Sequence, residues 1–184
     1  MYTLRVISGE KKGQPLKAVP GTTTRPTTDK VKESIFNIIG PYFDGGWVLD
    51  LYGGSGNLGI EALSRGVEKA IFVDQNRKAV EIIKDNLKVC SYTERAEVYR
   101  NDAKRALKAL IKREVSFTYI FLDPPYAEQK IEAEIGIIHD FNLLASGGTI
   151  VAEHDATIEL AEHIGSFSCK RREVYGDTAI SFYE

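Results

Sequence analysis

The sequence of 184 residues has few cysteines and lacks any long apolar run. Its two cysteines, Cys90 and Cys169, lie far apart without metal-ligand spacing, so we expect reduced structural thiols. No stretch approaches the roughly 20 consecutive apolar residues that a membrane helix needs. The N-terminus alternates polar and apolar residues, which is unlike a secretory signal. These absences predict a cytoplasmic protein without a membrane partner.

An excess of basic charge is missing as well. The formal net charge is −2, although charged residues make up 27% of the chain and hydrophobic residues 43%. This composition is typical of a globular protein, and the length suits one domain with a real core. Any affinity for nucleic acid must therefore come from a local patch and not from the whole chain.

Apolar runs alternate with helical patterns from Trp47 onwards. We expect strands over 47–52, 70–74, 96–100, 117–123 and 148–153, and helices over 57–66, 76–90, 103–113, 128–143 and 157–164. Strands that alternate with helices form a parallel sheet covered on both faces. The end differs, because Gly176-Asp177 joins 167–175 to 178–184 and suits a type II′ hairpin. We therefore expect a mostly parallel seven-stranded sheet whose last strand is antiparallel.

A smaller segment precedes this pattern. Residues 3–7 read as a short strand, and Gly9 and Gly13 allow a turn and a return of the chain. After a Thr-rich loop, Thr27 or Thr28 is placed to cap a helix that ends near Gly40. Its apolar face consists of Val31, Ile35, Ile38 and Ile39. We expect an N-terminal hairpin-and-helix extension over 1–42 and a main domain over 43–184, forming one compact unit.

The stretch DLYGGSGNLG follows the first expected strand and opens a helix. Gly54, Gly56 and Gly59 match G-x-G-x-x-G in the context that binds a nucleotide cofactor. Asp74 ends the second strand, where a carboxylate takes both hydroxyls of a ribose. Asp50 lies just before the glycines and would be awkward beside a pyrophosphate, whereas it suits the cationic amino acid end of S-adenosylmethionine.

A second candidate position follows the third strand. Asp102 is placed to accept a hydrogen bond from an adenine amino group, or to act as a helix N-cap, and both roles are compatible.

The fourth strand ends in Asp123-Pro124-Pro125-Tyr126, at the strand end where ligands bind in such sheets. The exocyclic amine of a nucleobase is a weak nucleophile, because its lone pair is delocalised into the ring. The Asp123 side chain and the Pro124 carbonyl would accept its N–H groups, and the prolines would hold both acceptors in place. Tyr126 offers a face for the base, worth roughly 1–3 kcal/mol. The stretch therefore predicts an amine-methylating site with Asp123, Pro124 and Tyr126 as catalytic residues.

The sequence resembles the bacterial RsmD family, which methylates the N2 of a guanine in 16S ribosomal RNA. The similar blocks are RVISGEKKGQPL, RPTTDKVKESIFNII, VLDLYGGSGNLGIEALSRG and FLDPPY, and they cover nearly the whole chain. The resemblance implies a Rossmann-like class I methyltransferase that uses S-adenosylmethionine and needs no metal. The cofactor-binding residues are then expected to be Asp50, Tyr52, Gly53, Gly54, Ser55, Gly56, Asp74, Gln75, Asp102 and Ala103.

The chain departs mildly from the family in the glycine loop, where the family usually has Phe-Ala in place of Tyr52-Gly53 and commonly Ala in place of Asn57.

The family's N-terminal extension is basic and implies contact with RNA. In this chain the corresponding residues are Lys11, Lys12, Lys17 and Arg25. We expect a monomer whose substrate is 16S rRNA in a partly assembled small ribosomal subunit. Two alternatives remain open at this point: an adenine-N6 or other amino methyltransferase of DNA or RNA, and a catalytically silent RNA-binding assembly factor.

Overall fold

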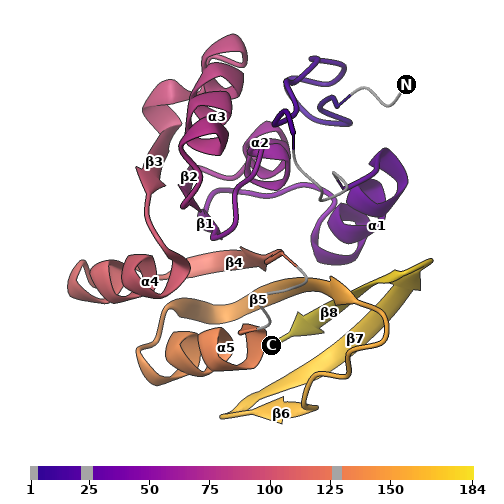
Figure 1. Ribbon diagram of the computed structural model, residues 1–184, viewed down its shortest axis with the longest axis vertical. Helices are drawn as coiled ribbons and strands as arrows, with labels where there is room; N and C mark the ends of the chain where they lie inside the picture. Colours follow the sequence, from indigo (N-terminus) through magenta and orange to yellow (C-terminus); the bar gives the residue numbers. More distant parts are fainter. Residues whose placement is uncertain (1–3, 22–26, 126–129) are drawn as a thin grey trace.

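The computed structural model describes residues 4–21, 27–125 and 130–184 and contains an eight-stranded sheet with the order β3-β2-β1-β4-β5-β8-β7-β6 (Figure 1). The strands are β1 (Trp47–Asp50), β2 (Lys69–Asp74), β3 (Ala96–Arg100), β4 (Phe117–Leu122), β5 (Leu144–Asp155), β6 (His163–Ile164), β7 (Phe167–Tyr175) and β8 (Thr178–Tyr183). The first five strands pair with one another in parallel, and β8 lies antiparallel between β5 and β7. The expected Rossmann-like α/β fold with an antiparallel last strand is confirmed.

Helices cover both faces of the sheet. They are α1 (Asp29–Ile39), α2 (Asn57–Ser64), α3 (Arg77–Val89), α4 (Ala103–Lys112) and α5 (Ile131–Asp140). Apolar side chains of α1, α2 and α3 pack in one core cluster, and those of α4 and α5 pack in another. Successive residues of β1, Val48 and Leu49, belong to opposite clusters, because side chains alternate across a strand. Burial on both faces explains why these strands appear as nearly continuous apolar runs.

The prediction of a helix over 157–164 is wrong. Residues 157–164 form no helix but a turn and the short strand β6, which pairs with β7. The Cys169 amide donates to the carbonyl of Glu162, and the Tyr183 hydroxyl donates to that of Ala161. An eight-residue helix is marginal on its own, so these contacts with neighbouring strands decide the conformation. The sheet thereby gains an eighth strand.

The N-terminal segment is more irregular than a hairpin. Within the described residues its pairing is an isolated bridge between Arg5 and Pro15. Gly9 and Gly13 have φ of 88°, as the expected turn requires. Of the two candidate caps for α1, Thr28 is the one that accepts from the Val31 amide, at 3.3 Å.

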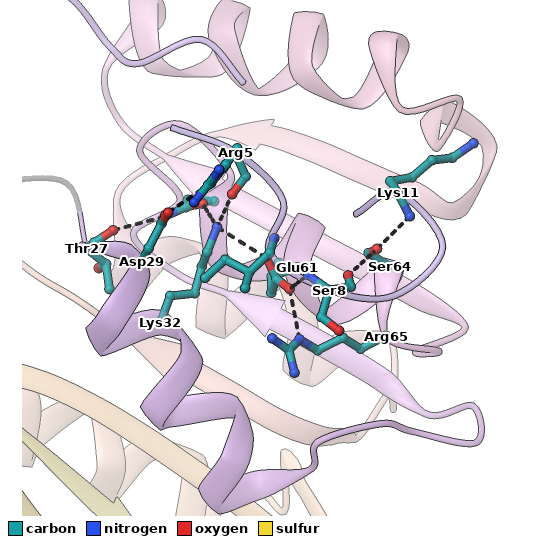
Figure 2. A network of polar contacts seen from close by, with 12 residues as sticks. Arg5, Ser8, Lys11, Thr27, Asp29, Lys32, Glu61, Ser64 and Arg65 are labelled. Carbon is teal, nitrogen blue, oxygen red and sulfur yellow. Dashed lines mark hydrogen bonds and ion pairs between the residues drawn. The ribbon is translucent and has the colours of Figure 1, made fainter. Parts of the chain in front are cut away.

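A buried polar network fastens this segment and α1 to α2 (Figure 2). Glu61 of α2 is fully buried, and each of its carboxylate oxygens accepts two donors. Oε1 accepts from the amide of Ile7 at 2.9 Å and from Lys32 Nζ at 3.2 Å, and Oε2 accepts from the amide of Ser8 at 3.1 Å and from Arg65 Nε at 2.8 Å. Lys32, also fully buried, donates in addition to the carbonyl of Arg5.

Among the residues that the structure describes, no helix is both long and apolar enough to cross a membrane.

Candidate active site

A cavity of about 1320 Å³ opens at the carboxyl ends of the parallel strands. Among the acidic side chains that line it, four lie at or near the ends of different strands: Asp50 of β1, Asp74 of β2, Asp123 after β4 and Glu153 of β5. Since the carboxyl ends of parallel strands meet at one edge, the topology alone brings them together. The cavity is also lined by these further expected site residues: Tyr52, Gly53, Gly54, Ser55, Gln75, Asp102, Ala103 and Pro124.

The glycine loop forms a tight strand-to-helix turn. Gly56 has φ of 83° and is the N-cap of α2, a conformation that favours glycine. Its amide donates to the Gly53 carbonyl at 2.7 Å, which closes the turn, and its expected contact with a cofactor stays a prediction. A Cβ on Gly53 would come within 2.8 Å of Ile83 Cδ1, which shows how closely the loop packs on α3.

Asp74 is fixed by two backbone donors. Its Oδ2 accepts from the Gly54 amide and its Oδ1 from the Asn76 amide, both at 2.9 Å. The carboxylate is therefore oriented by the glycine loop on one side and by the start of α3 on the other. Each carboxylate oxygen accepts more than one hydrogen bond, so acceptor capacity remains for the hydroxyls of a ribose.

Asp102 is the N-cap of α4. It accepts from the amides of Lys104 at 3.4 Å and Arg105 at 3.1 Å. The capping role is thus established, and because Asp102 and Ala103 also line the cavity, the adenine-binding role stays a prediction beside it.

Asp50 is buried, and its Oδ2 accepts from the Gly59 amide in the first turn of α2 at 3.1 Å. Burial raises the pKa of Asp50 to about 7, the Gly59 hydrogen bond opposes this rise, and the nearby Asp74 charge adds to it. A cation in the cavity would favour the ionised carboxylate.

The departure from the family at Tyr52 has a partner that the sequence did not reveal. The Tyr52 hydroxyl donates to Glu134 Oε2 of α5 at 2.6 Å. Glu134 is buried, and burial raises its pKa to about 7, which the Tyr52 hydrogen bond opposes. The phenol that replaces the usual Phe thus fixes a carboxyl group in the wall of the cavity.

The tip after β4 carries the expected catalytic residues. Asp123 is partly buried, Pro124 is buried and both line the cavity, while Pro125 is exposed. Tyr126 lies outside the described residues. Burial raises the pKa of Asp123 well above its ordinary value, and the nearby carboxyls of Glu153 and Asp50 raise it further. Asp123 and Glu153 follow the paired residues Leu122 and Ala152 on adjacent strands, and each carboxyl shifts the pKa of the other.

Glu153 and Thr27 were missed in the sequence analysis. Thr27 Oγ1 donates to Glu153 Oε2 at 3.2 Å, and both residues line the cavity. A signal for Glu153 was present, because it follows the apolar run of the fifth strand just as Asp50, Asp74 and Asp123 follow theirs. For Thr27, its place in the RPTTDKVKES block was the only indication.

The expected RNA-binding lysines, Lys11, Lys12 and Lys17, have different surroundings. Lys17 forms an exposed ion pair with Asp85 at 3.2 Å, and the ammonium of Lys11 lies 5.8 Å from the centre of the Tyr92 ring. Lys12 is exposed and lines a second hollow of about 510 Å³. Arg25 lies outside the described residues.

The cavity fits a cofactor that has a ribose, an adenine and a cationic end. Asp74, Asp102 and Asp50 line it and would supply an acceptor for each of these parts, and the glycine loop would let the ligand approach the backbone. Three carboxyl groups around the loop would repel a pyrophosphate and attract a positive charge. The donor and acceptor set therefore matches S-adenosylmethionine better than a dinucleotide.

Comparisons with known proteins agree with this geometry. Residues 4–184 match the profile of the family described as "Conserved hypothetical protein 95". The chain is 60% identical to "Putative rRNA methyltransferase YlbH" of Bacillus subtilis over 98% of both chains. It is 29% identical to "Ribosomal RNA small subunit methyltransferase D" of Escherichia coli K12 over 98% of this chain and 89% of that protein.

A solved structure supports the same assignment. "Putative methyltransferase yhhF from Escherichia coli" superposes with a TM-score of 0.82 at 30% identity, over 98% of this chain and 97% of that chain. The match to the family profile spans nearly all of this chain, and the high identity to the Bacillus protein extends over its whole length. The chain therefore belongs to this methyltransferase family, the RsmD family that its sequence blocks resemble.

Proposed function

We propose that this protein transfers a methyl group from S-adenosylmethionine to the exocyclic N2 amine of a guanine in small-subunit ribosomal RNA. The observation that carries the proposal is one cavity that contains both the glycine loop with Asp74 and the Asp123-Pro124 tip. The names of the relatives from Bacillus subtilis and Escherichia coli support rRNA as the substrate class.

The cofactor side of the cavity has three tasks. Asp74, held by the amides of Gly54 and Asn76, would bind the ribose hydroxyls. Asp102 would accept from the adenine amine, and Asp50 would face the cationic end. When bound, S-adenosylmethionine supplies an activated methyl group on a sulfonium centre, so no metal is needed for activation.

The substrate side of the cavity is formed by the residues that follow β4. Asp123 and the Pro124 carbonyl would accept both N–H groups of the amine, which favours the pyramidal nitrogen that attacks a methyl group. Asp123 would stabilise the positive charge that develops on this nitrogen, so its effect falls on the transition state more than on substrate binding. Tyr126 would provide the stacking face for the base.

The substrate is proposed to be rRNA within a partly assembled small subunit, bound by a monomer in the cytoplasm. With a net charge of −2, the protein has only local basic groups for phosphates. Contacts from Lys11, Lys12, Lys17 and Arg25 would make activity fall as salt rises. A substrate already held by ribosomal proteins compensates for weak binding to naked RNA.

The test is labelled methyl transfer to 16S rRNA from cells that lack this protein. Naked RNA, assembly intermediates and mature subunits are compared, and a nucleoside digest identifies the base. We expect N2-methylguanosine, with the fastest reaction on intermediates. N6-methyladenosine would replace the guanine assignment, and equal activity on naked RNA would refute the preference for intermediates.

The Asp123→Ala variant tests the catalytic assignment. Removing one preorganised electrostatic partner lowers a rate by about 10²-fold or more. We expect this loss in single-turnover transfer with little change in cofactor affinity, and a smaller loss for Asp123→Asn. A wild-type rate in Asp123→Ala would refute the role of the tip, and a wild-type protein without any transfer activity would favour a silent assembly factor.

A further inference from the structure

The carboxyl neighbour of Asp123 has no assigned task in the proposed reaction. We propose that Asp123 and Glu153 share one proton and that Glu153, acting through Asp123, accepts the proton that the methylated amine must lose. Glu153 is thus a positioning residue for the reaction. This inference rests on the proposed amine methylation.

Sheet register places the two side chains together. Leu122 of β4 pairs with Ala152 of the adjacent parallel strand β5, so Asp123 and Glu153 occupy the next position on each strand. Both line the cavity, and each carboxyl shifts the pKa of the other. Two neighbouring carboxyl groups can hydrogen-bond to each other only when one of them is protonated, because an ionised carboxylate only accepts.

The surroundings favour a single negative charge on the pair. Burial is the main cause that raises the pKa of each group, and the carboxyls of Glu153 and Asp50 raise that of Asp123 further. Asp50 in turn faces Asp74, so the surroundings of the pair are acidic. The Thr27 hydroxyl lowers the pKa of Glu153, whereas the Glu153 carboxyl raises that of Asp123. Because the Thr27 hydroxyl donates to Glu153 Oε2 and so stabilises its ionised form, the proposal places the shared proton on Asp123 and the charge on Glu153.

Such a pair provides a route for the departing proton. As the N–C bond forms and the sulfonium S–C bond breaks, the positive charge passes from sulfur to the amine nitrogen. The N–H proton then moves to the free oxygen of Asp123, while the proton that Asp123 held moves to Glu153. The products are a neutral methylated amine, a neutral thioether and two protonated carboxyls, and the release of one proton to water restores the pair.

Thr27 connects this pair to the N-terminal segment. Its hydroxyl donates to Glu153 Oε2, and its backbone carbonyl accepts from the Asn57 side chain at 3.5 Å. Asn57 Oδ1 in turn accepts from Lys32 Nζ at 2.6 Å. The network of Figure 2 therefore continues to Glu153 and fixes the orientation of its carboxylate.

The first measurement requires no RNA. Infrared spectra recorded as the pH is raised detect the carboxyl groups that stay protonated after those of Asp50 and Glu134, with pKa values of about 7, have ionised. We expect a protonated carboxyl band in the wild type that outlasts these two groups and that is absent at the same pH in Glu153→Gln and in Asp123→Asn. The band should persist in Glu159→Gln, a control at an exposed glutamate that does not line the cavity. Persistence in Glu153→Gln would overturn the shared proton.

The second measurement is the pH dependence of single-turnover transfer. Glu153→Gln keeps a hydrogen-bonding group but accepts no proton, so we expect a loss of about 10²-fold near neutral pH. Because burial still raises the pKa of Asp123, the variant should recover as pH rises and Asp123 itself ionises. A loss of the same size at every pH would indicate a structural role and overturn the inference.

A second pair of variants guards against misfolding of Glu153→Gln. Thr27→Val removes the hydroxyl that lowers the pKa of Glu153, so the acid limb of the rate profile should move to higher pH, and Thr27→Ser should restore it. An unshifted limb in Thr27→Val would contradict the role of Glu153. If wild-type protein methylates no RNA but shows the infrared band, the proposed function fails while the shared proton stands.

Discussion

Glu61 is the residue whose replacement should disturb the fold most, through the network of Figure 2. Its carboxylate is fully buried and accepts four donors, two at each oxygen. In Glu61→Gln the new NH₂ group would face two donors whichever way the amide is turned. On one side these are the amide of Ile7 and Lys32 Nζ, and on the other the amide of Ser8 and Arg65 Nε. Two buried cations would also lose their counter-charge.

Breaking a buried ion pair by removing one partner typically costs about 3–5 kcal/mol. For a domain of this size, each kcal/mol lowers Tm by about 2–4 °C. We therefore expect Glu61→Gln to lower Tm by about 6–20 °C. The amides of Ile7 and Ser8 should also exchange hydrogen faster, because their acceptor is weakened.

Calorimetry and hydrogen exchange measure these effects, with Glu81→Gln as the matched control. Glu81 pairs with Arg77 on the surface, where the side chains are 60% and 78% exposed. Such a pair contributes about 0.3–0.5 kcal/mol, so the control should shift Tm by less than about 2 °C. If Glu61→Gln shifts Tm no more than this control, the reasoning about the buried network is refuted.

Three further predictions concern the cavity and its support. Cofactor affinity should rise between about pH 6 and 8, because a bound cation favours ionised Asp50, whose pKa is about 7, and binding then releases a proton. Calorimetry in buffers of different ionisation enthalpy should show that this proton release is abolished in Asp50→Asn and retained in Glu134→Gln. Asp74→Ala should weaken cofactor binding roughly 10- to 150-fold by loss of a charge-assisted bond, and unchanged affinity would remove Asp74 from the site. Gly59→Ala would place a Cβ 2.3 Å from Phe72 Cε1, so urea unfolding should show a loss of about 1–3 kcal/mol, and an unchanged midpoint would contradict this packing.

Local chemistry made several features predictable from the sequence. The glycine loop, the acids at the ends of the first and second strands and the rigid Asp123-Pro124 tip are each encoded within a few neighbouring residues. Alternation of strands and helices then dictated a parallel sheet, and a parallel sheet gathers its strand ends at one edge. The sequence blocks that resemble the RsmD family indicated rRNA methylation as well.

Other features depended on residues that are distant in the chain. The segment 157–164 has a helical pattern, but its hydrogen bonds to β7 and β8 impose an extended path. Lys32 is a charged residue beside the apolar face of α1, yet it is buried against Glu61, 29 positions away, because α1 packs on α2 at that point. A charge at such a position is tolerable only with a partner, and the sequence does not say which residue the partner is.

The pairing of Asp123 with Glu153 also depends partly on the local sequence and partly on the tertiary structure. Each acid follows its own apolar run. Asp123 was identified from the sequence, and Glu153 could have been identified in the same way. That β4 and β5 are neighbours, with Leu122 opposite Ala152, follows only from the sheet order and register. Because a carboxyl pair shares a proton only at hydrogen-bonding distance, its electrostatics were decided by the tertiary structure and not by the two strands taken separately.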